Sequence, residues 1–272
     1  MFLDSDDCLR EDSLDIINKT LSVDAVDLVV FGNVNLKSGS GYVPSESISD
    51  HIFYEAEIKT KVLPFFLNLT TDNQYNILPC VTNKCYSKQI LQNVLFDETF
   101  PTWEDGLFNI FVLRDTNSCV CISEKLYQIN DGGYAESFHL ASRYFPNLAE
   151  KWIYQYEVVC SLFGQIYDCK SQYAVSRYWR ILDGILTNAV INEIPNKMGV
   201  FQSVALDKTV KEWSKTVRPI SNFEMLKLFS IRTKNWHMLY GLYYMGYATS
   251  KCSVETFKIW LRKIAIKLRL LR

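Results

Sequence analysis

Short apolar runs between polar and acidic segments mark the first half of this chain. They occupy residues 25–32, 77–81 and 119–127, and each has the length of a buried or half-buried strand. The run at 77–81 leads into polar residues and a short stretch up to residue 88, a pattern that predicts a strand, a turn and a short helix. The first half is therefore expected to be α/β.

From residue 148 onward the apolar residues recur every three or four positions, which is the period of a helix that buries one face. Two stretches, 152–163 and 178–189, carry this period. Their apolar faces consist of Trp152, Ile153, Tyr156, Val159, Cys160 and Phe163, and of Tyr178, Ile181, Leu182, Ile185, Leu186 and Ala189. The pattern predicts an α/β region at 1–147 and an all-helical region at 148–272.

Charge divides the chain at nearly the same place. Residues 1–150 carry 10 lysines and arginines against 22 acidic residues, whereas residues 151–272 carry 19 against 8. The whole chain of 272 residues has a net charge of −1 and is 48% hydrophobic, which is enough to bury a core in each of two units. The change in pattern and the change in charge together place a boundary near residues 146–147.

The cysteines and histidines indicate neither disulfides nor a zinc site. The eight cysteines have no paired C-x-x-C spacing, and several lie inside apolar runs, so they are expected to be reduced and to pack as small apolar residues. His51, His139 and His237 stand far apart in the sequence, at no ligand spacing from a cysteine pair.

Other features of the composition predict a cytoplasmic globular protein. No apolar run reaches the ~18 residues of a membrane-spanning helix, and no basic-then-apolar leader opens the chain. The aromatic residues follow helical core spacing without a recognised binding motif, so nucleic acid is not expected as a partner.

Carboxylates follow an apolar run at the very start of the chain. Residues 1–3 are apolar, and Asp4, Asp6 and Asp7 come directly after them, as at the end of a strand beside a metal and a nucleotide. Mg²⁺ and Mn²⁺ prefer oxygen ligands, and carboxylates can share such a metal with a diphosphate. An EF-hand is excluded, since that loop needs glycine and glutamate at the positions of Leu9 and Asp15. A solvated end or a helix cap is the alternative interpretation.

Two further polar motifs come about 80 and 100 residues later. Asn83 and Lys84 lie in the expected turn, where a lysine meets a phosphate or caps a helix. Glu104 and Asp105 open an expected helix. The alternative for this acidic pair is a capping box with Thr102, because acids in a first turn also suit the helix dipole.

Taken in order, these motifs resemble the second half of the catalytic domain of bacterial family 2 glycosyltransferases, which have the GT-A fold. The resemblance covers roughly residues 1–140 and is carried by FLDSDD, DLVVFG, NKCYSK, FDETF with WEDGLFN, and EKLYQIN. It implies a mixed sheet with flanking helices, followed by an all-helical C-terminal unit. The family's first strand and its base- and ribose-binding carboxylate have no counterpart in this sequence, which is expected of a truncated or mis-started reading frame.

The resemblance implies transfer of a sugar from a nucleotide-diphosphate donor to an acceptor hydroxyl. A divalent metal, Mn²⁺ or Mg²⁺, would be held by Asp6 with Asp4 and would stabilise the charge that develops on the diphosphate. Asp7 and Lys84 are implied as further donor-binding residues.

The same resemblance assigns the catalytic roles to the acidic pair. Asp105 is implied as the base that takes the proton from the attacking hydroxyl, and Glu104 as the residue that orients Asp105 or the acceptor. Tyr127 is expected to pack at a sheet edge. Gln128 and Asn130 depart from the basic residue that the family often has after this strand.

The last 16 residues, 257–272, hold six bases and no acid. A basic amphipathic helix with tryptophan and leucine on its other face is typical of an anchor on anionic lipid, and the alternative is a packed helix with a solvated basic face. The family's acceptors are often lipid-linked glycans at the inner membrane surface, which implies a peripheral location and a role in cell-surface or exopolysaccharide synthesis. The other functional hypothesis is a non-catalytic remnant that associates with a membrane or a partner.

Overall fold

The structure, a computed structural model, describes residues 1–22, 26–35, 50–73, 75, 77–92, 94–100, 103–130, 147–192 and 196–251. The chain forms two compact units, of which the first comprises Met1–His139 with Leu162–Cys169 and the second Leu140–Ser161 with Lys170–Arg272. The boundary expected between 147 and 148 stays a prediction. The basic end at 257–272 lies outside the described residues, as do Thr102 and His139.

A mixed sheet organises the first unit. Its described strands are β1 (Cys8–Leu9), β2 (Leu28–Asn35), β3 (His51–Tyr54), β4 (Lys84–Tyr86) and β5 (Ser118–Ile129). The order is β1-β5-β2-β4, and β3 also pairs with β5. The β2–β5 pair is parallel and the other pairs are antiparallel, so the expected mixed sheet is confirmed.

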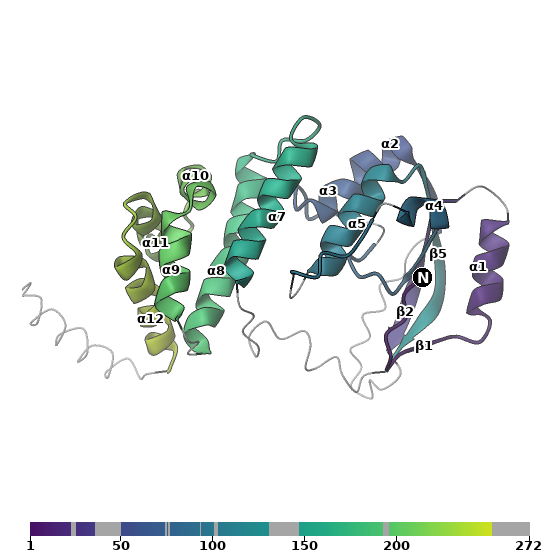
Figure 1. Ribbon diagram of the computed structural model, residues 1–272, viewed down its shortest axis with the longest axis horizontal. Coiled ribbons are helices and arrows are strands. Elements are labelled where there is room, and N and C mark those ends of the chain that lie inside the picture. Colours follow the sequence, from purple (N-terminus) through teal and green to yellow (C-terminus); the bar gives the residue numbers. More distant parts are fainter. Residues whose placement is uncertain are drawn as a thin grey trace, which may run out of the picture. The chain divides into compact units, whose positions relative to one another are not determined.

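Helices flank this sheet on both faces, as Figure 1 shows for α1 and α5. The helical elements of the unit are α1 (Ser13–Leu21), α2 (Glu55–Glu57), a π-helical turn (Ile58–Val62), α3 (Leu63–Phe66), α4 (Lys88–Leu91) and α5 (Glu104–Asp115). On the α1 side, Ile17 joins a core with Val29, Phe31 and Tyr127. The expected α/β architecture with flanking helices is thereby confirmed.

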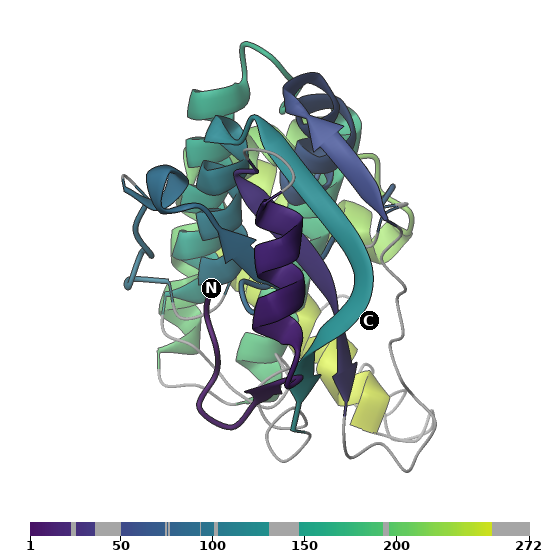
Figure 2. The same ribbon diagram turned by 90° about the vertical axis from the view of Figure 1, so that its right-hand side faces the viewer.

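Two buried strands, β2 and β5, run side by side through the sheet. The predicted run at 25–32 gives the start of β2, where the side chains from Leu28 to Phe31 are fully buried. The register with β5 shifts at Gly32, where a Cβ atom would come within 3.1 Å of Lys125 Cγ. Glycine at position 32 thus permits the irregular pairing between β2 and β5. Beyond this point β5 continues, and Figure 2 shows it as a long curved strand.

Two expected strands are absent from the described structure. Residues 1–3 form no strand; instead Phe2 packs its ring edge-on against Phe108, with ring centres 5.6 Å apart. Residues 77–81 also form no strand, and β4 begins only at Lys84. The second error has a clear physical reason, because Pro79 has no N–H group to donate to a ladder. The short helix expected after this turn is present as α4.

The second unit is helical throughout its described part. Its helices are α7 (Leu148–Phe163, whose last two residues belong to the first unit), α8 (Gln172–Ile191), α9 (Lys197–Leu206), α10 (Lys208–Thr216), α11 (Asn222–Arg232) and α12 (Trp236–Lys251). The apolar face predicted for 178–189 is buried in the core of this unit, with Cys160 and Ile181 partly buried against it. The expected all-helical character is confirmed for the residues described. None of the described helices combines the length and the apolarity needed to cross a membrane.

Candidate active site

The carboxylate turn, residues 4–7, follows the packed ring of Phe2. The N–H group of Asp7 donates to the carbonyl oxygen of Asp4 at 3.2 Å, which closes the turn. Partial desolvation, followed by repulsion from Asp7 and Asp6, raises the pKa of the Asp4 carboxyl above its usual value. Crowded carboxylates of this kind attract a cation.

Residues at the end of β5 hold the carboxylate turn in place. The hydroxyl group of Tyr127 donates to Asp7 Oδ2 at 2.7 Å and accepts from the Asp4 N–H group at 3.2 Å. The N–H group of Asn130 donates to Asp7 Oδ1 at 2.8 Å. Tyr127 lies opposite Leu9 of β1 and Asn33 of β2, so its expected place at a sheet edge is wrong.

The acidic pair opens α5 as expected. Trp103 is the N-cap residue of this helix, with a left-handed φ of 71°, and its side chain makes no capping hydrogen bond. Asp105 is half-buried, and its Oδ2 atom accepts a hydrogen bond from the N–H group of Val81 at 3.2 Å. This carboxylate therefore bonds to a loop 24 residues earlier in the chain.

The environment of Asp105 raises its pKa above the usual value. Burial is the main cause of this rise, and repulsion from Glu104 and Asp4 adds to it. The hydrogen bond from Val81 and the positive charge of Lys84 act in the opposite direction and lower the pKa. The charge of Asp4 thus contributes to the raised pKa of Asp105, although 100 residues separate the two in the sequence. A direct contact also brings the two segments together, because Phe2 packs against Phe108 of α5.

Lys84 is fully buried beneath this site. Its ammonium group donates to the carbonyl oxygens of Leu78 and Cys80 at 2.7 and 2.6 Å. It also donates to Asn83 Oδ1 at 2.7 Å. Burial lowers the pKa of Lys84, and these three oxygens satisfy its donors. The structure therefore places this lysine inside the loop of residues 78–81.

Asn109 also holds this loop, although it is not among the residues predicted for the site. Its side-chain amide donates to the carbonyl oxygens of Pro79 and Asp105 at 2.8 and 2.9 Å, and its oxygen accepts from the hydroxyl group of Tyr86 at 2.9 Å. A fully buried asparagine inside an apolar helix needs such partners. A polar residue within the run GLFNIFVL was the available signal.

The oxygen ligands of the carboxylate turn fit a hard divalent cation. Within the described part of the chain, no hydrogen bond or ion pair occupies the carboxylate oxygens of Asp4 or Asp6. No group of three or more histidine, cysteine or acidic residues there is arranged as a metal site. Mg²⁺ commonly takes only one or two protein carboxylates and fills its other positions with water and substrate phosphates. Asp4 and Asp6 can thus supply the one or two protein carboxylates that such a metal site needs.

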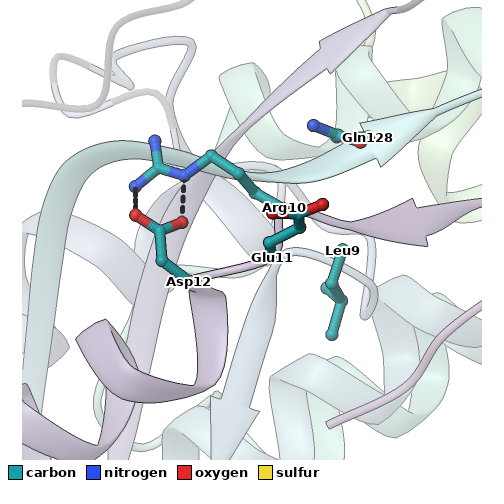
Figure 3. Close-up of a pocket in the computed structure, with 5 residues that line it drawn as sticks. All are labelled: Leu9, Arg10, Glu11, Asp12 and Gln128. Carbon is teal, nitrogen blue, oxygen red and sulfur yellow. Dashed lines mark hydrogen bonds and ion pairs between the residues drawn. The ribbon is translucent and has the colours of Figure 1, made fainter.

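A shallow pocket lies at the end of β1 and the residues that follow it. Leu9, Arg10, Glu11, Asp12 and Gln128 line it, as Figure 3 shows. The guanidinium group of Arg10 bonds to Asp12 at 2.5 Å and to Glu124 at 2.9 Å, so its positive charge is already paired. The pocket includes none of the predicted site residues.

Comparisons with known proteins support the architecture. No protein-family model and no curated protein matches the chain. Solved structures of S. aureus TarS 1–349 do match. The complex with UDP-GlcNAc aligns at a TM-score of 0.54 and 15% identity, over 92% of this chain and 67% of that structure. The complex with UDP aligns at 0.53 and 14%, again over 92% and 67%. A third TarS 1–349 structure aligns at 0.51 and 13%, over 92% and 66%. TarS is a family 2 glycosyltransferase. The chain therefore spans about two thirds of these structures and has their GT-A fold, as the order of the sequence motifs predicted.

Proposed function

We propose that this chain is a family 2 glycosyltransferase that transfers a sugar from a nucleotide-diphosphate donor to an acceptor hydroxyl. One observation carries the proposal: the carboxylate turn lies beside the start of α5, because the ring of Phe2 packs against Phe108 with ring centres 5.6 Å apart, and the charge of Asp4 adds to the raised pKa of Asp105. They come together in a fold shared with TarS, whose structures contain UDP or UDP-GlcNAc. A uridine diphosphate sugar is accordingly the first donor to test.

Asp6 and Asp4 are proposed to hold the divalent metal, Mn²⁺ or Mg²⁺. Such an ion, when bound, would stabilise the negative charge that the leaving diphosphate acquires. The protein's part is to hold the two carboxylates together at one end of the site. The raised pKa of Asp4 is consistent with this role, since a cation would relieve the repulsion from Asp6 and Asp7.

Asp105 is proposed to act as the base, and Glu104 to orient Asp105 or the acceptor. The attacking hydroxyl must lose its proton as the new bond to the sugar forms, and the proton passes to the carboxylate of Asp105. Burial raises the pKa of this carboxylate, which makes it a stronger base than an exposed aspartate. The hydrogen bond from Val81 fixes one of its oxygens, and the other is left for the acceptor.

Lys84 was expected to bind the nucleotide-sugar donor. We now propose that it instead stabilises the loop beneath the site. Its three hydrogen bonds hold the loop of residues 78–81, and Val81 in turn holds Asp105. Asp7 is likewise proposed to act through its bonds to β5 rather than by direct contact with the donor.

The acceptor is proposed to be a glycan or a lipid-linked glycan of cell-surface or exopolysaccharide synthesis. The basic segment 257–272 would then bind an anionic membrane surface and keep a cytoplasmic enzyme on the inner face of the cell membrane. These two parts of the proposal rest on the sequence.

Calorimetric titration of the 272-residue chain with UDP, in the presence and absence of Mn²⁺, tests the donor site. Binding that requires Mn²⁺ and is lost in Asp6→Ala is the expected result. Asp15→Ala is the matched control, because Asp15 is an exposed aspartate on α1 and should bind like the unmodified chain. A folded chain that binds neither UDP nor other nucleotide diphosphates would contradict the proposal and favour the non-catalytic remnant.

A further inference from the structure

We infer that Tyr127 is the positioning residue of the metal site, and that Asp7 connects Tyr127 to the carboxylate turn instead of binding the metal. The inference rests on the proposed function, because the turn has a metal to position only in a glycosyltransferase of this kind. It assigns different tasks to the three aspartates, which the sequence pattern alone does not distinguish.

The hydroxyl group of Tyr127 bonds to both ends of the carboxylate turn. It donates to the side chain of Asp7 at 2.7 Å and accepts from the main-chain N–H group of Asp4 at 3.2 Å. Ser5 and Asp6 lie between these two points and are exposed. The hydroxyl oxygen of Tyr127 therefore ties both ends of the turn to β5, in addition to the main-chain bond from Asp7 to Asp4 that closes the turn.

Both carboxylate oxygens of Asp7 are engaged by β5 and the residue that follows it. Oδ2 accepts from Tyr127, and Oδ1 accepts from the N–H group of Asn130 at 2.8 Å. A metal bound by Asp7 would have to compete with two charge-assisted hydrogen bonds. The carboxylates of Asp4 and Asp6 have no such partners within the residues described, so these two remain available to a cation.

Tyr127 is itself firmly placed. Its side chain is 1% exposed and packs in the core with Val29 and Leu126. It belongs to β5, which is paired with β1 on one side and with β2 on the other. The hydroxyl group is thus fixed to the centre of the sheet, which gives the turn a rigid support.

A tyrosine hydroxyl group carries its proton at neutral pH, so Tyr127 can donate a hydrogen bond to the Asp7 carboxylate.

Tyr127→Phe removes the hydroxyl group and keeps the buried ring. We expect Mn²⁺-dependent UDP binding to weaken about tenfold, the lower end of the effect known for residues that orient metal ligands. Without Mn²⁺, neither this variant nor the unmodified chain is expected to bind UDP. Tyr243→Phe is the matched control, because it removes a buried tyrosine hydroxyl that donates to Asp183 in the other unit. Unchanged Mn²⁺ dependence in Tyr127→Phe, beside an unmodified chain that does bind, would overturn the inference.

Amide hydrogen exchange tests the link between Tyr127 and the turn without any nucleotide. In Tyr127→Phe the Asp4 amide loses its acceptor, so its exchange should become several times faster, whereas Tyr243→Phe should leave it unchanged. Equal exchange rates in the two variants would refute the positioning role even if the chain bound no donor. Absence of UDP binding together with faster exchange would contradict only the proposed function.

Asp7→Asn provides a second variant in case Tyr127→Phe does not fold. The amide oxygen still accepts one hydrogen bond, so Mn²⁺-dependent binding should weaken but remain detectable. Complete loss of that binding, equal to the loss in Asp6→Ala, would instead identify Asp7 as a metal ligand and overturn the inference.

Discussion

Buried lysines in the two units meet different kinds of partner. In the helical unit, the ammonium group of Lys227 bonds to the carboxylate of Asp183 at 2.7 Å and lies 3.8 Å from the centre of the Tyr243 ring. In the first unit, Lys84 donates to three neutral oxygens of its own loop. The helical unit thus pairs its buried charge with an opposite charge.

The contrast extends to the carboxylates. Asp183 accepts from both Lys227 and Tyr243, so its negative charge is satisfied inside the unit. Burial instead raises the pKa of both Asp4 and Asp105, and neighbouring carboxylates add to it: Asp7 and Asp6 for Asp4, and Glu104 and Asp4 for Asp105. Carboxylates whose pKa values are raised by burial and by like charges are typical of a site that binds a ligand, whereas a carboxylate paired with a lysine is typical of structural support. The difference supports placing the chemistry in the first unit.

The largest expected effect is the loss of sugar transfer in Asp105→Asn. Without a carboxylate to accept the proton, the rate of transfer should fall by about 10²- to 10⁴-fold. Mn²⁺-dependent UDP binding should change little, since Asp105 is not among the proposed metal ligands. Asp115→Asn, at the other end of α5, is the control and should retain activity. Full turnover by Asp105→Asn would show that Asp105 is not the base. It would also show that the carboxylates of the two units do not differ in the way proposed.

The next effect concerns stability and compares the two lysines directly. Lys84→Met leaves two main-chain carbonyl groups and Asn83 without their donor, so the free energy of unfolding should fall by about 3 kcal/mol. Lys227→Met leaves Asp183 with its bond from Tyr243 and should cost about 1 kcal/mol less than that. Urea unfolding of both variants measures the difference. A larger loss for Lys227→Met would mean that the charge pair contributes more to stability than the neutral loop.

The smallest effect is a pH-dependent gain in stability. Because the pKa of Asp105 is higher in the folded state, the native protein binds more protons than the unfolded chain above pH ~4, and stability declines as the pH rises through the folded pKa. Asp105→Asn removes this penalty. Its melting temperature should therefore exceed that of the unmodified chain by a few degrees at pH 7, and the gain should vanish near pH 4. An equal gain at both pH values would show that burial of the charge is not the cause.

Much of the fold was predictable because local patterns encode it. The strand at 119–127 and the helices at 152–163 and 178–189 follow from apolar periodicity, and the structure contains them. The start of α5 at Glu104 was also foreseen. These elements bury the side chains that their own sequence marks as apolar, so no knowledge of distant partners was needed.

The missed features depend on partners that lie far away in the sequence. Residues 1–3 look like a strand, yet Phe2 packs among aromatic rings about 100 residues later. Tyr127 looks like any strand tyrosine until its hydroxyl group is seen to bond to Asp7. Lys84 follows a turn in the sequence, a setting typical of exposed lysines, but the loop folds over its ammonium group. Periodicity reports which side chains are buried, and it says little about which polar atoms meet.

The burial of Lys84 also makes it a reporter of local opening. Reagents that modify amines can reach this ammonium group only when the loop of residues 78–81 separates from it. The rate at which Lys84 is acylated would therefore measure how often the loop of residues 78–81, which includes Val81, opens. Since Val81 fixes Asp105, the same rate would measure how often the site loses its arrangement, and a bound donor should slow it.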